Sequence, residues 1–364
     1  MKLGVLTFHY GSNYGGVLQC YALQQVLKGM GHDVYVINYV PHDGLKKFLF
    51  VLLYFIRRRN VESLKALWHY VFYHKKSRAV FRDFRTHYLS MTKEEKDIEK
   101  FSDIELDAIF VGSDQVWNYS QQKRKAYFLG WVNNKNIKKN SYAACCGLNS
   151  IDERYRNEVI NQLSLFTAIS VRSEETQLFI KELLNKTVQV VADPTILYDF
   201  NEFLAPSNQH YILTYILTED IKGGNEKAIE IIRKNYPRLP VYSIIISDRQ
   251  PRLCKWADKK LYDVRPDEWV NLIYNCSFLY TDSFHGSVFA MKFGKPFVAY
   301  YGSEVAGRRF MDLKKMYHLQ NVITEAIEVA DVFRRNVCTS DTFRSISHEN
   351  IKESLSFIEA SLCK

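Results

Sequence analysis

The sequence contains no hydrophobic run long enough to span a bilayer, which takes about 20 consecutive apolar residues. It also contains no internal repeat and no low-complexity tract. Only 8 prolines accompany 47% hydrophobic residues, so the composition is that of an ordered globular protein and not of a linker-rich chain. No secretory signal precedes the first strand pattern, and we therefore expect a cytoplasmic protein.

Cysteine occurs seven times, an odd number without the spacing of a disulfide framework. Cys145 and Cys146 are adjacent, but they lie in an apolar run and no His or Cys pair with metal-ligand spacing accompanies them. The ten histidines include no convincing ligand pair at helical spacing. We expect reduced, buried thiols, no metal and no bound cofactor.

The charge is positive and unevenly distributed. There are 49 Lys and Arg against 40 Asp and Glu, a formal net charge of +9, which suits an anionic partner. Residues 46–59 contain nine apolar residues (48–56) between Lys46-Lys47 and Arg57-Arg58-Arg59. This segment is too short to cross a membrane but can insert shallowly among anionic headgroups at the inner face of the membrane. A buried helix with solvated ends is an equal alternative. No nucleic-acid-binding motif is present, so no nucleic acid is expected.

Apolar runs of strand length alternate with helical patterns along most of the chain. In the first half, strands are predicted at 3–8, 33–39, 108–111, 141–146, 168–172 and 188–192, and helices at 16–30, 152–166 and 174–184. The pattern breaks near 201–209 and resumes with strands at 211–217, 241–246, 276–280 and 296–301 and helices at 225–235 and 266–275. Such alternation predicts two α/β domains with parallel sheets, residues 1–200 and 201–330, and a C-terminal helical segment, 331–364, that packs back on the first domain.

Two such domains predict a cleft at the carboxyl ends of the strands, where polar loops gather. The most informative loop is residues 281–287, Thr-Asp-Ser-Phe-His-Gly-Ser, between a strand and a short helix predicted at 288–294. It places His285 beside a helix N-terminus, which favours an anion. A histidine there can both neutralise a phosphate and move a proton.

Three further loops follow predicted strands. Residues 9–16 carry Gly15 and Gly16 before a helix, although their spacing is not that of a dinucleotide fingerprint, and a tight turn is an equal alternative. Residues 112–118 combine Asp114 and Asn118, which can grip a sugar hydroxyl, with an aromatic wall; a helix cap is the alternative. Arg172 ends a strand and can clamp a carboxylate or phosphate, or form a surface ion pair with the glutamates that follow it. The turn at 193–195 is secondary.

Together these stretches resemble the polysaccharide pyruvyl transferase family, in this order along the chain: 7–27, 112–118, 141–144, 171–172, 193–195 and 281–286. The resemblance implies two Rossmann-like domains facing a cleft, similar to the B-type glycosyltransferases. It also implies transfer of pyruvate from phosphoenolpyruvate to a sugar, often as a cyclic ketal, in the biosynthesis of surface polysaccharide such as capsule or exopolysaccharide.

By position, His285 resembles the histidine at the phosphoenolpyruvate site of that family, and Arg172 an arginine that holds this donor. Some members have an arginine two residues before the histidine, where this chain has Ser283; Arg308, Arg309 or Lys295 can supply the missing charge. The full prediction has His285 as general acid and Asp114 as base. The donor-binding set is Arg172, Ser283, Gly286, Ser287, Arg308 and Arg309. The acceptor-binding set is Asn13, Tyr14, Gly15, Gly16, Gln115, Trp117 and Asn118.

The expected partners are phosphoenolpyruvate and a lipid-linked sugar acceptor. One alternative is a nucleotide-sugar-dependent glycosyltransferase of the same architecture, in which Asp282 or Glu304 binds a ribose. A second is a non-catalytic membrane- or nucleic-acid-binding protein, based on the net charge. The second does not explain why polar clusters recur at successive strand ends.

Overall fold

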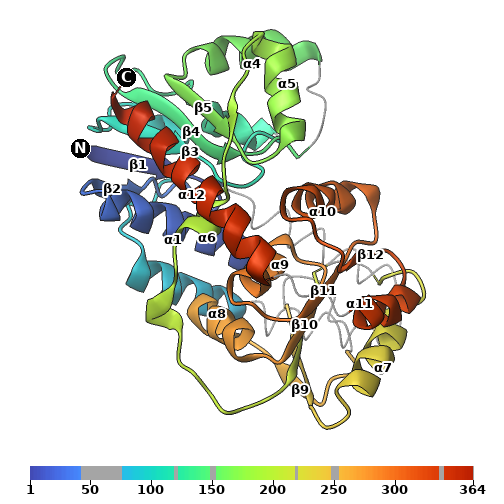
Figure 1. Ribbon diagram of the computed structural model, residues 1–364. Helices are drawn as coiled ribbons and strands as arrows, with labels where there is room; N and C mark the ends of the chain where they lie inside the picture. The colour runs from blue at the N-terminus through green and yellow to red at the C-terminus, as the bar shows by residue number, and fades with distance from the viewer. Residues whose placement is uncertain are drawn as a thin grey trace, which may run out of the picture. The chain divides into compact units, whose positions relative to one another are not determined.

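The computed structural model describes residues 1–41, 76–118, 122–147, 153–217, 220–246, 254–335 and 340–363 (Figure 1). The basic apolar segment 46–59 lies outside the described residues. The chain forms two compact units: unit 1 comprises residues 1–42, 85–199 and 347–364, and unit 2 comprises 43–84 and 200–346. The changeover at 199–200 adjoins the predicted boundary at 200. Residues 76–84 and 331–346 group with unit 2, unlike the predicted division.

Unit 1 contains a six-stranded parallel sheet in the order β2-β1-β3-β4-β5-β6. Its strands are β1 Lys2–Leu6, β2 Asp33–Val36, β3 Ala108–Val111, β4 Lys138–Ala144, β5 Ala168–Val171 and β6 Gln189–Val190. The register pairs Leu6 with Val111 and Val111 with Ser141. β1 and β3 therefore finish at the same level, and β4 continues three residues further to Ala144, which pairs with Val171 at the end of β5. The loops that follow these parallel strands share one edge of the sheet.

Helices of unit 1 flank this sheet. They are α1 Tyr14–Gly29, α4 Glu153–Ser164, α5 Glu174–Leu184, α6 Pro194–Leu197 and the C-terminal part of α12 Ser340–Cys363, with 3-10 turns η1 Ile98–Phe101 and η2 Gln122–Phe128. The side chain of Ser173 caps α5, whose C-cap Asn185 is left-handed. The Ser354 hydroxyl of α12 accepts a 2.9 Å hydrogen bond from the Ala192 N–H, and Figure 1 shows α12 beside the sheet.

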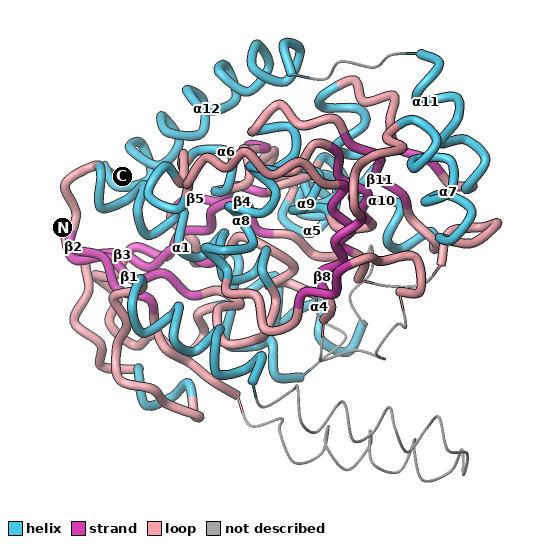
Figure 2. Tube along the Cα trace, turned by 90° about the horizontal axis from the view of Figure 1, so that it is seen from below, coloured by secondary structure: helices cyan, strands magenta, loops and turns pink. Residues whose placement is uncertain are grey.

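Unit 2 repeats the design, with a parallel sheet in the order β12-β11-β10-β7-β8-β9. The strands are β7 Ile212–Tyr215, β8 Val241–Ile244, β9 Lys259–Leu261, β10 Phe278–Thr281, β11 Phe297–Tyr300 and β12 Val322–Ile323. The helices are α7 Asn225–Asn235, α8 Pro266–Asn275, α9 Phe284–Lys292, α10 Glu304–Tyr317 and α11 Val329–Arg335, with 3-10 turns η3 Asn201–Phe203 and η4 Ala326–Glu328. Helices flank the strands of each unit in Figure 2.

The predicted fold class is confirmed, because both units are parallel sheets flanked by helices, as in Rossmann-like folds. The predicted cleft stays a prediction. One local expectation is wrong: α9 begins at Phe284 and not at residue 288, because the Ser283 hydroxyl caps it by accepting the Gly286 N–H at 3.1 Å. Of the described helices, none combines the length and apolar character needed to cross a bilayer.

Candidate functional site

The carboxyl-end edge of the unit 1 sheet is held together by a buried hydrogen-bond network. The Thr7 hydroxyl, after β1, donates to the Ser113 carbonyl, after β3, at 2.8 Å. Gln19 of α1 donates to the Thr7 hydroxyl at 2.9 Å and accepts from the Ser113 N–H at 3.0 Å. All three residues have no exposed surface. The network fixes the start of the 112–118 loop against β1 and α1.

The backbone of this loop requires a glycine at its first position. Gly112 has φ +109°, and a Cβ there would lie 2.3 Å from the Tyr142 carbonyl oxygen of β4. Asp114 has φ +73°, a left-handed conformation that aspartate tolerates better than most residues. Its carboxylate accepts the Gln115 N–H at 2.8 Å, and its backbone pairs with Ala144. This tight turn places the Asp114 carboxylate at the end of the sheet.

Arg172 follows β5 and is ion-paired on two sides. Its Nη1 donates to Asp193 Oδ2 at 2.9 Å, and its Nη2 lies 3.6 Å from Asp114 Oδ1. Burial by itself lowers the pKa of Arg172, but the surrounding negative charge, that of Asp193 first, outweighs burial and raises it. The guanidinium is thus permanently charged. With both carboxyls ionised, the three groups carry a net charge of −1.

The structure brings together Asp114 and Arg172 but gives core contacts to other predicted residues of this edge. Asn13 caps α1 by accepting the Gly16 N–H at 3.3 Å. Tyr14, Gly15 and Gly16 are buried in the first turn of α1. The Trp117 ring is 2% exposed, stacks on Phe128 and donates to the Tyr127 carbonyl. Gln115 and Asn118 are partly exposed.

The carboxyl-end edge of unit 2 is organised around Thr281 and Ser283. The Thr281 hydroxyl donates to the Tyr215 carbonyl of β7 at 2.6 Å and accepts the Ser283 N–H at 3.0 Å. The Ser287 hydroxyl donates to the Ser283 carbonyl at 3.1 Å. A Cβ on Gly286 would lie 2.9 Å from the Thr281 hydroxyl oxygen, so glycine allows this close approach. The first turn of α9 is therefore tightly fixed to the sheet.

His285 lies in that first turn, with 8% of its surface exposed, and its ring packs edge-on against Phe284 at 5.1 Å. Asp282 is 6% exposed, and its carboxylate accepts the Leu217 N–H after β7. Asp282 thus joins two strand ends through one carboxylate oxygen.

The two groups of candidate replacements for the missing arginine lie in different places. Arg308 and Arg309 are on α10, which follows β11 at the same sheet edge as Ser283. Lys295 comes before β11, at the amino-end edge, and its ammonium lies 5.4 Å from the centre of the Tyr274 ring. Lys295 is therefore not part of this edge. The expectation that Lys295 can supply the charge is wrong, because Lys295 precedes β11 whereas Ser283 follows the parallel strand β10, so the two residues lie at opposite edges of the sheet.

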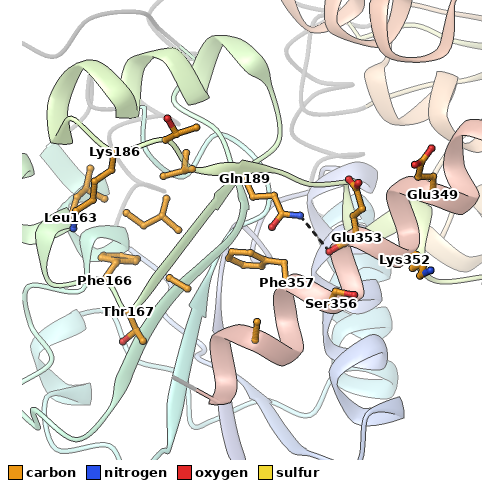
Figure 3. A pocket seen from close by; sticks show the side chains of 15 residues that line it. Leu163, Phe166, Thr167, Lys186, Gln189, Glu349, Lys352, Glu353, Ser356 and Phe357 are labelled. Carbon is orange, nitrogen blue, oxygen red and sulfur yellow. Dashed lines mark hydrogen bonds between the residues drawn. The ribbon is translucent and has the colours of Figure 1, made fainter.

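Unit 1 also has a cavity of about 910 Å³, located away from Arg172. It is lined by 166–169 at the amino end of β5, by 186–189, and by α12. In Figure 3 Phe166 and Phe357 border it, and the Gln189 amide reaches the Glu353 carbonyl. Among the described residues, no group of three His, Cys, Asp or Glu side chains could hold a metal ion.

The protein belongs to the polysaccharide pyruvyl transferase family, whose model matches residues 13–304 of the 364-residue chain. No curated protein matches the sequence significantly. The family prediction is therefore confirmed by a match that includes Asp114, Arg172 and His285.

Solved structures share the fold at low sequence identity. UDP-GlcNAc 2-epimerase of Methanocaldococcus jannaschii, in complex with UDP-GlcNAc and UDP, is 15% identical with a TM-score of 0.54, over 98% of this chain and 100% of that one. Arabidopsis thaliana UGT89C1, complexed with UDP-L-rhamnose, is 13% identical with a TM-score of 0.56, over 100% and 99%. Anabaena Alr3699/HepE, in complex with UDP and glucose, is 11% identical with a TM-score of 0.54, over 100% of both. At such identities the likeness shows the fold alone.

Sequence reasoning missed the residues that hold the unit 1 edge together. Thr7, Gln19 and Asp193 lie in stretches that carry the family resemblance, but the local pattern indicates no role for the first two side chains and only a secondary turn at Asp193. The signal that existed was the position of Asp193 directly after a predicted strand in the same domain as Asp114. Its partners lie 80 and 21 residues away, at Ser113 and Arg172.

Proposed function

We propose that the protein transfers pyruvate from phosphoenolpyruvate to a pair of sugar hydroxyls, forming a cyclic ketal during surface-polysaccharide biosynthesis. The observation that carries this proposal is the family match over 13–304, within which His285 occupies the capped first turn of a helix at a sheet edge. Phosphoenolpyruvate carries a phosphate and a carboxylate, and helix N-termini and cations are the groups that bind such anions.

For the donor, we assign the phosphate to the N-terminus of α9, whose turn contains Ser283, Gly286 and Ser287. Arg308 and Arg309 of α10 are the candidates for the additional positive charge. Arg172 remains a proposed donor ligand by family resemblance. Its charge is offset by two carboxylates, so it would act as a directed hydrogen-bond donor more than as a source of net positive potential.

For the acceptor, we assign the sugar to the 112–118 loop and to the first turn of α1, where Asn13, Gly15 and Gly16 lie. Asp114 is the proposed base for the attacking hydroxyl, because its carboxylate is at a strand end and its side chain is 13% exposed. The net charge of −1 on the group formed by Asp193, Arg172 and Asp114 suits a neutral polyol, whose hydroxyls donate hydrogen bonds to carboxylates.

The proposed reaction proceeds in balanced steps. His285 gives a proton to the methylene carbon of phosphoenolpyruvate, which makes the adjacent carbon positive. A sugar hydroxyl attacks that carbon and loses its proton to Asp114. Inorganic phosphate then leaves with the electrons of its C–O bond and takes the proton held by Asp114. The second hydroxyl of the same sugar attacks the same carbon, closes the ketal and gives its proton back to His285. No metal or redox step is required.

The decisive experiment incubates the protein with phosphoenolpyruvate and a panel of free and lipid-linked galactosides and mannosides. Phosphate release must accompany a mass gain of one pyruvate less one water on the sugar. His285→Asn should lower kcat by at least about 10²-fold, the usual contribution of a general acid. His210→Asn, an exposed histidine of the same unit, is the matched control and should have normal activity. Full activity in the His285 variant would contradict the assignment.

A nucleotide-sugar-dependent glycosyltransferase is the second candidate, favoured by fold neighbours solved with UDP compounds. The family match over 13–304 ranks it below the pyruvyl transferase proposal. Release of nucleotide from UDP-sugars, with no phosphate release from phosphoenolpyruvate, would establish this alternative. We also propose a lipid-linked acceptor at the inner face of the membrane, reached through the 46–59 segment.

A further inference from the structure

Asp193 is the most deeply buried of three charged groups at the unit 1 edge. The side chains of Asp193, Arg172 and Asp114 are 1%, 7% and 13% exposed, in that order. Asp193 is thus the innermost of the three side chains, Asp114 is nearest the surface, and the Arg172 guanidinium lies between them. Asp114 is therefore placed to touch a ligand, whereas Asp193 is placed behind Arg172.

The Asp193 carboxylate accepts four hydrogen bonds. Its Oδ2 accepts from Arg172 Nη1 at 2.9 Å and from the Ser113 hydroxyl at 3.1 Å. Its Oδ1 accepts from the Thr195 N–H at 3.0 Å and the Thr195 hydroxyl at 2.8 Å. A carboxylate held in this way cannot rotate, and charge-assisted bonds of this kind are about twice as strong as neutral ones.

The backbone next to Asp193 is equally fixed. The Ala192 N–H donates to the Ser354 hydroxyl of α12 at 2.9 Å, and its carbonyl accepts from the Tyr142 hydroxyl of β4 at 2.8 Å. Both side chains are fully buried. Asp193 is thus attached to a helix, to β4 and to its own turn before it contacts Arg172.

Asp193 Oδ2 accepts hydrogen bonds from two groups, the Arg172 guanidinium and the Ser113 hydroxyl, and each of them is also close to Asp114. Through Arg172 it sets the guanidinium whose Nη2 lies 3.6 Å from Asp114 Oδ1. Through Ser113 it sets the hydroxyl that accepts the Asp114 N–H at 2.6 Å. We infer that Asp193 is a positioning residue that, through Arg172 and Ser113, fixes the orientation of the Asp114 carboxylate for the acceptor. This inference rests on the proposed function for its kinetic consequences, but not for the physical coupling.

A double-mutant cycle tests this inference with Asp193→Asn and Arg172→Lys, which keeps the positive charge but loses the two-pronged guanidinium. We expect each single variant to lower kcat/KM for the acceptor by about 10²-fold, the effect of a displacement of about 1 Å at a reacting group. At saturating phosphoenolpyruvate, where a donor contact of Arg172 does not limit the rate, the double variant should be no worse than the poorer single variant, because both changes disturb the Asp114 carboxylate through the same Asp193–Arg172 contact. Multiplying effects would overturn the inference.

Tyr142→Phe is the matched control, since it removes one hydrogen bond beside Asp193 and leaves the carboxylate and its four donors in place. It should lower the melting temperature without changing kcat/KM of the folded enzyme. If Asp193→Asn behaves in the same way, with lowered stability and normal kinetics, Asp193 is only structural and the inference is wrong.

Melting temperatures of the four cycle members separate this inference from the proposed function. If the wild-type protein transfers no pyruvate, the proposed function fails. The coupling between Asp193 and Arg172 can still be tested in that case. Non-additive shifts in melting temperature support their contact through Asp193 Oδ2, and additive shifts refute it.

Discussion

Replacing Gly112 with alanine tests whether the 112–118 loop is built as described. The substitution has two costs. A φ of +109° is unfavourable for any residue with a Cβ, by about 1–2 kcal/mol. The new methyl would also lie 2.3 Å from the Tyr142 carbonyl oxygen and 3.3 Å from the Ala144 backbone. Overpacking against backbone costs about 1–3 kcal/mol more.

Gly31→Ala isolates the second cost. Gly31 follows α1 in the same unit, has φ +85°, and a Cβ there would meet nothing within 4 Å. It therefore has the backbone cost without the collision. We expect Gly31→Ala to lose about 1–2 kcal/mol and Gly112→Ala about 2–5 kcal/mol in free energy of unfolding. For a unit of this size each kcal/mol lowers the melting temperature by about 2–4 °C.

The assay is differential scanning calorimetry together with hydrogen exchange read on peptides that cover β3 and β4. Gly112→Ala should speed exchange in these two strands, because the Tyr142 carbonyl must move. Gly31→Ala should leave them protected. Equal melting temperatures for the two variants would show that β4 does not approach Gly112 as closely as the structure has it.

Two other predictions concern His9 and the 46–59 segment. Burial lowers the pKa of His9 below 6.5, so on acidification the unfolded state binds a proton before the folded state does. The free energy of unfolding therefore falls as the pH drops from 6.5 towards the lower pKa of the folded state. At pH 5.5 this loss is at most about 1.4 kcal/mol. His9→Asn should remove this loss in urea titrations at pH 7.5 and 5.5, and an unchanged pH dependence would contradict it. Neutralising Arg57, Arg58 and Arg59 should reduce salt-sensitive binding to anionic vesicles, and retained binding would refute the proposed membrane contact.

The sequence predicted elements well where caps and apolar periodicity agree. The bounds of α5 and α8 match the expected ranges, since Ser173, Asn185 and Pro266 are strong local signals. The bounds of α7 match as well, from apolar periodicity alone, because its N-cap Gly224 makes no side-chain cap bond. The start of α9 was missed because Gly286 suggested a loop, whereas its lack of a side chain serves close contact with Thr281. The strand β9, with the sequence Lys-Lys-Leu, has no apolar run to reveal it.

The candidate site was only partly predictable for a different reason. Asp114, Arg172 and His285 follow buried strands, so their position at sheet edges could be inferred from local pattern. Their partners could not. Thr7 and Ser113 are 106 residues apart, and Ser113 and Asp193 are 80 apart. These pairs meet only because the strand order is β1-β3-β4-β5-β6, and a single sequence does not specify that order.

The two sheet edges differ in charge, and this difference bears on the ligand proposed for each. At the unit 1 edge, two carboxylates outweigh one guanidinium that is already paired with both. A multiply charged anion gains little there, while a sugar can donate hydroxyl hydrogens to Asp114. At the unit 2 edge, Asp282 contributes one negative charge, whereas Arg308 and Arg309 of α10 contribute two positive charges and the N-terminus of α9 adds positive potential. The charges alone therefore favour the acceptor at the first edge and the anionic donor at the second.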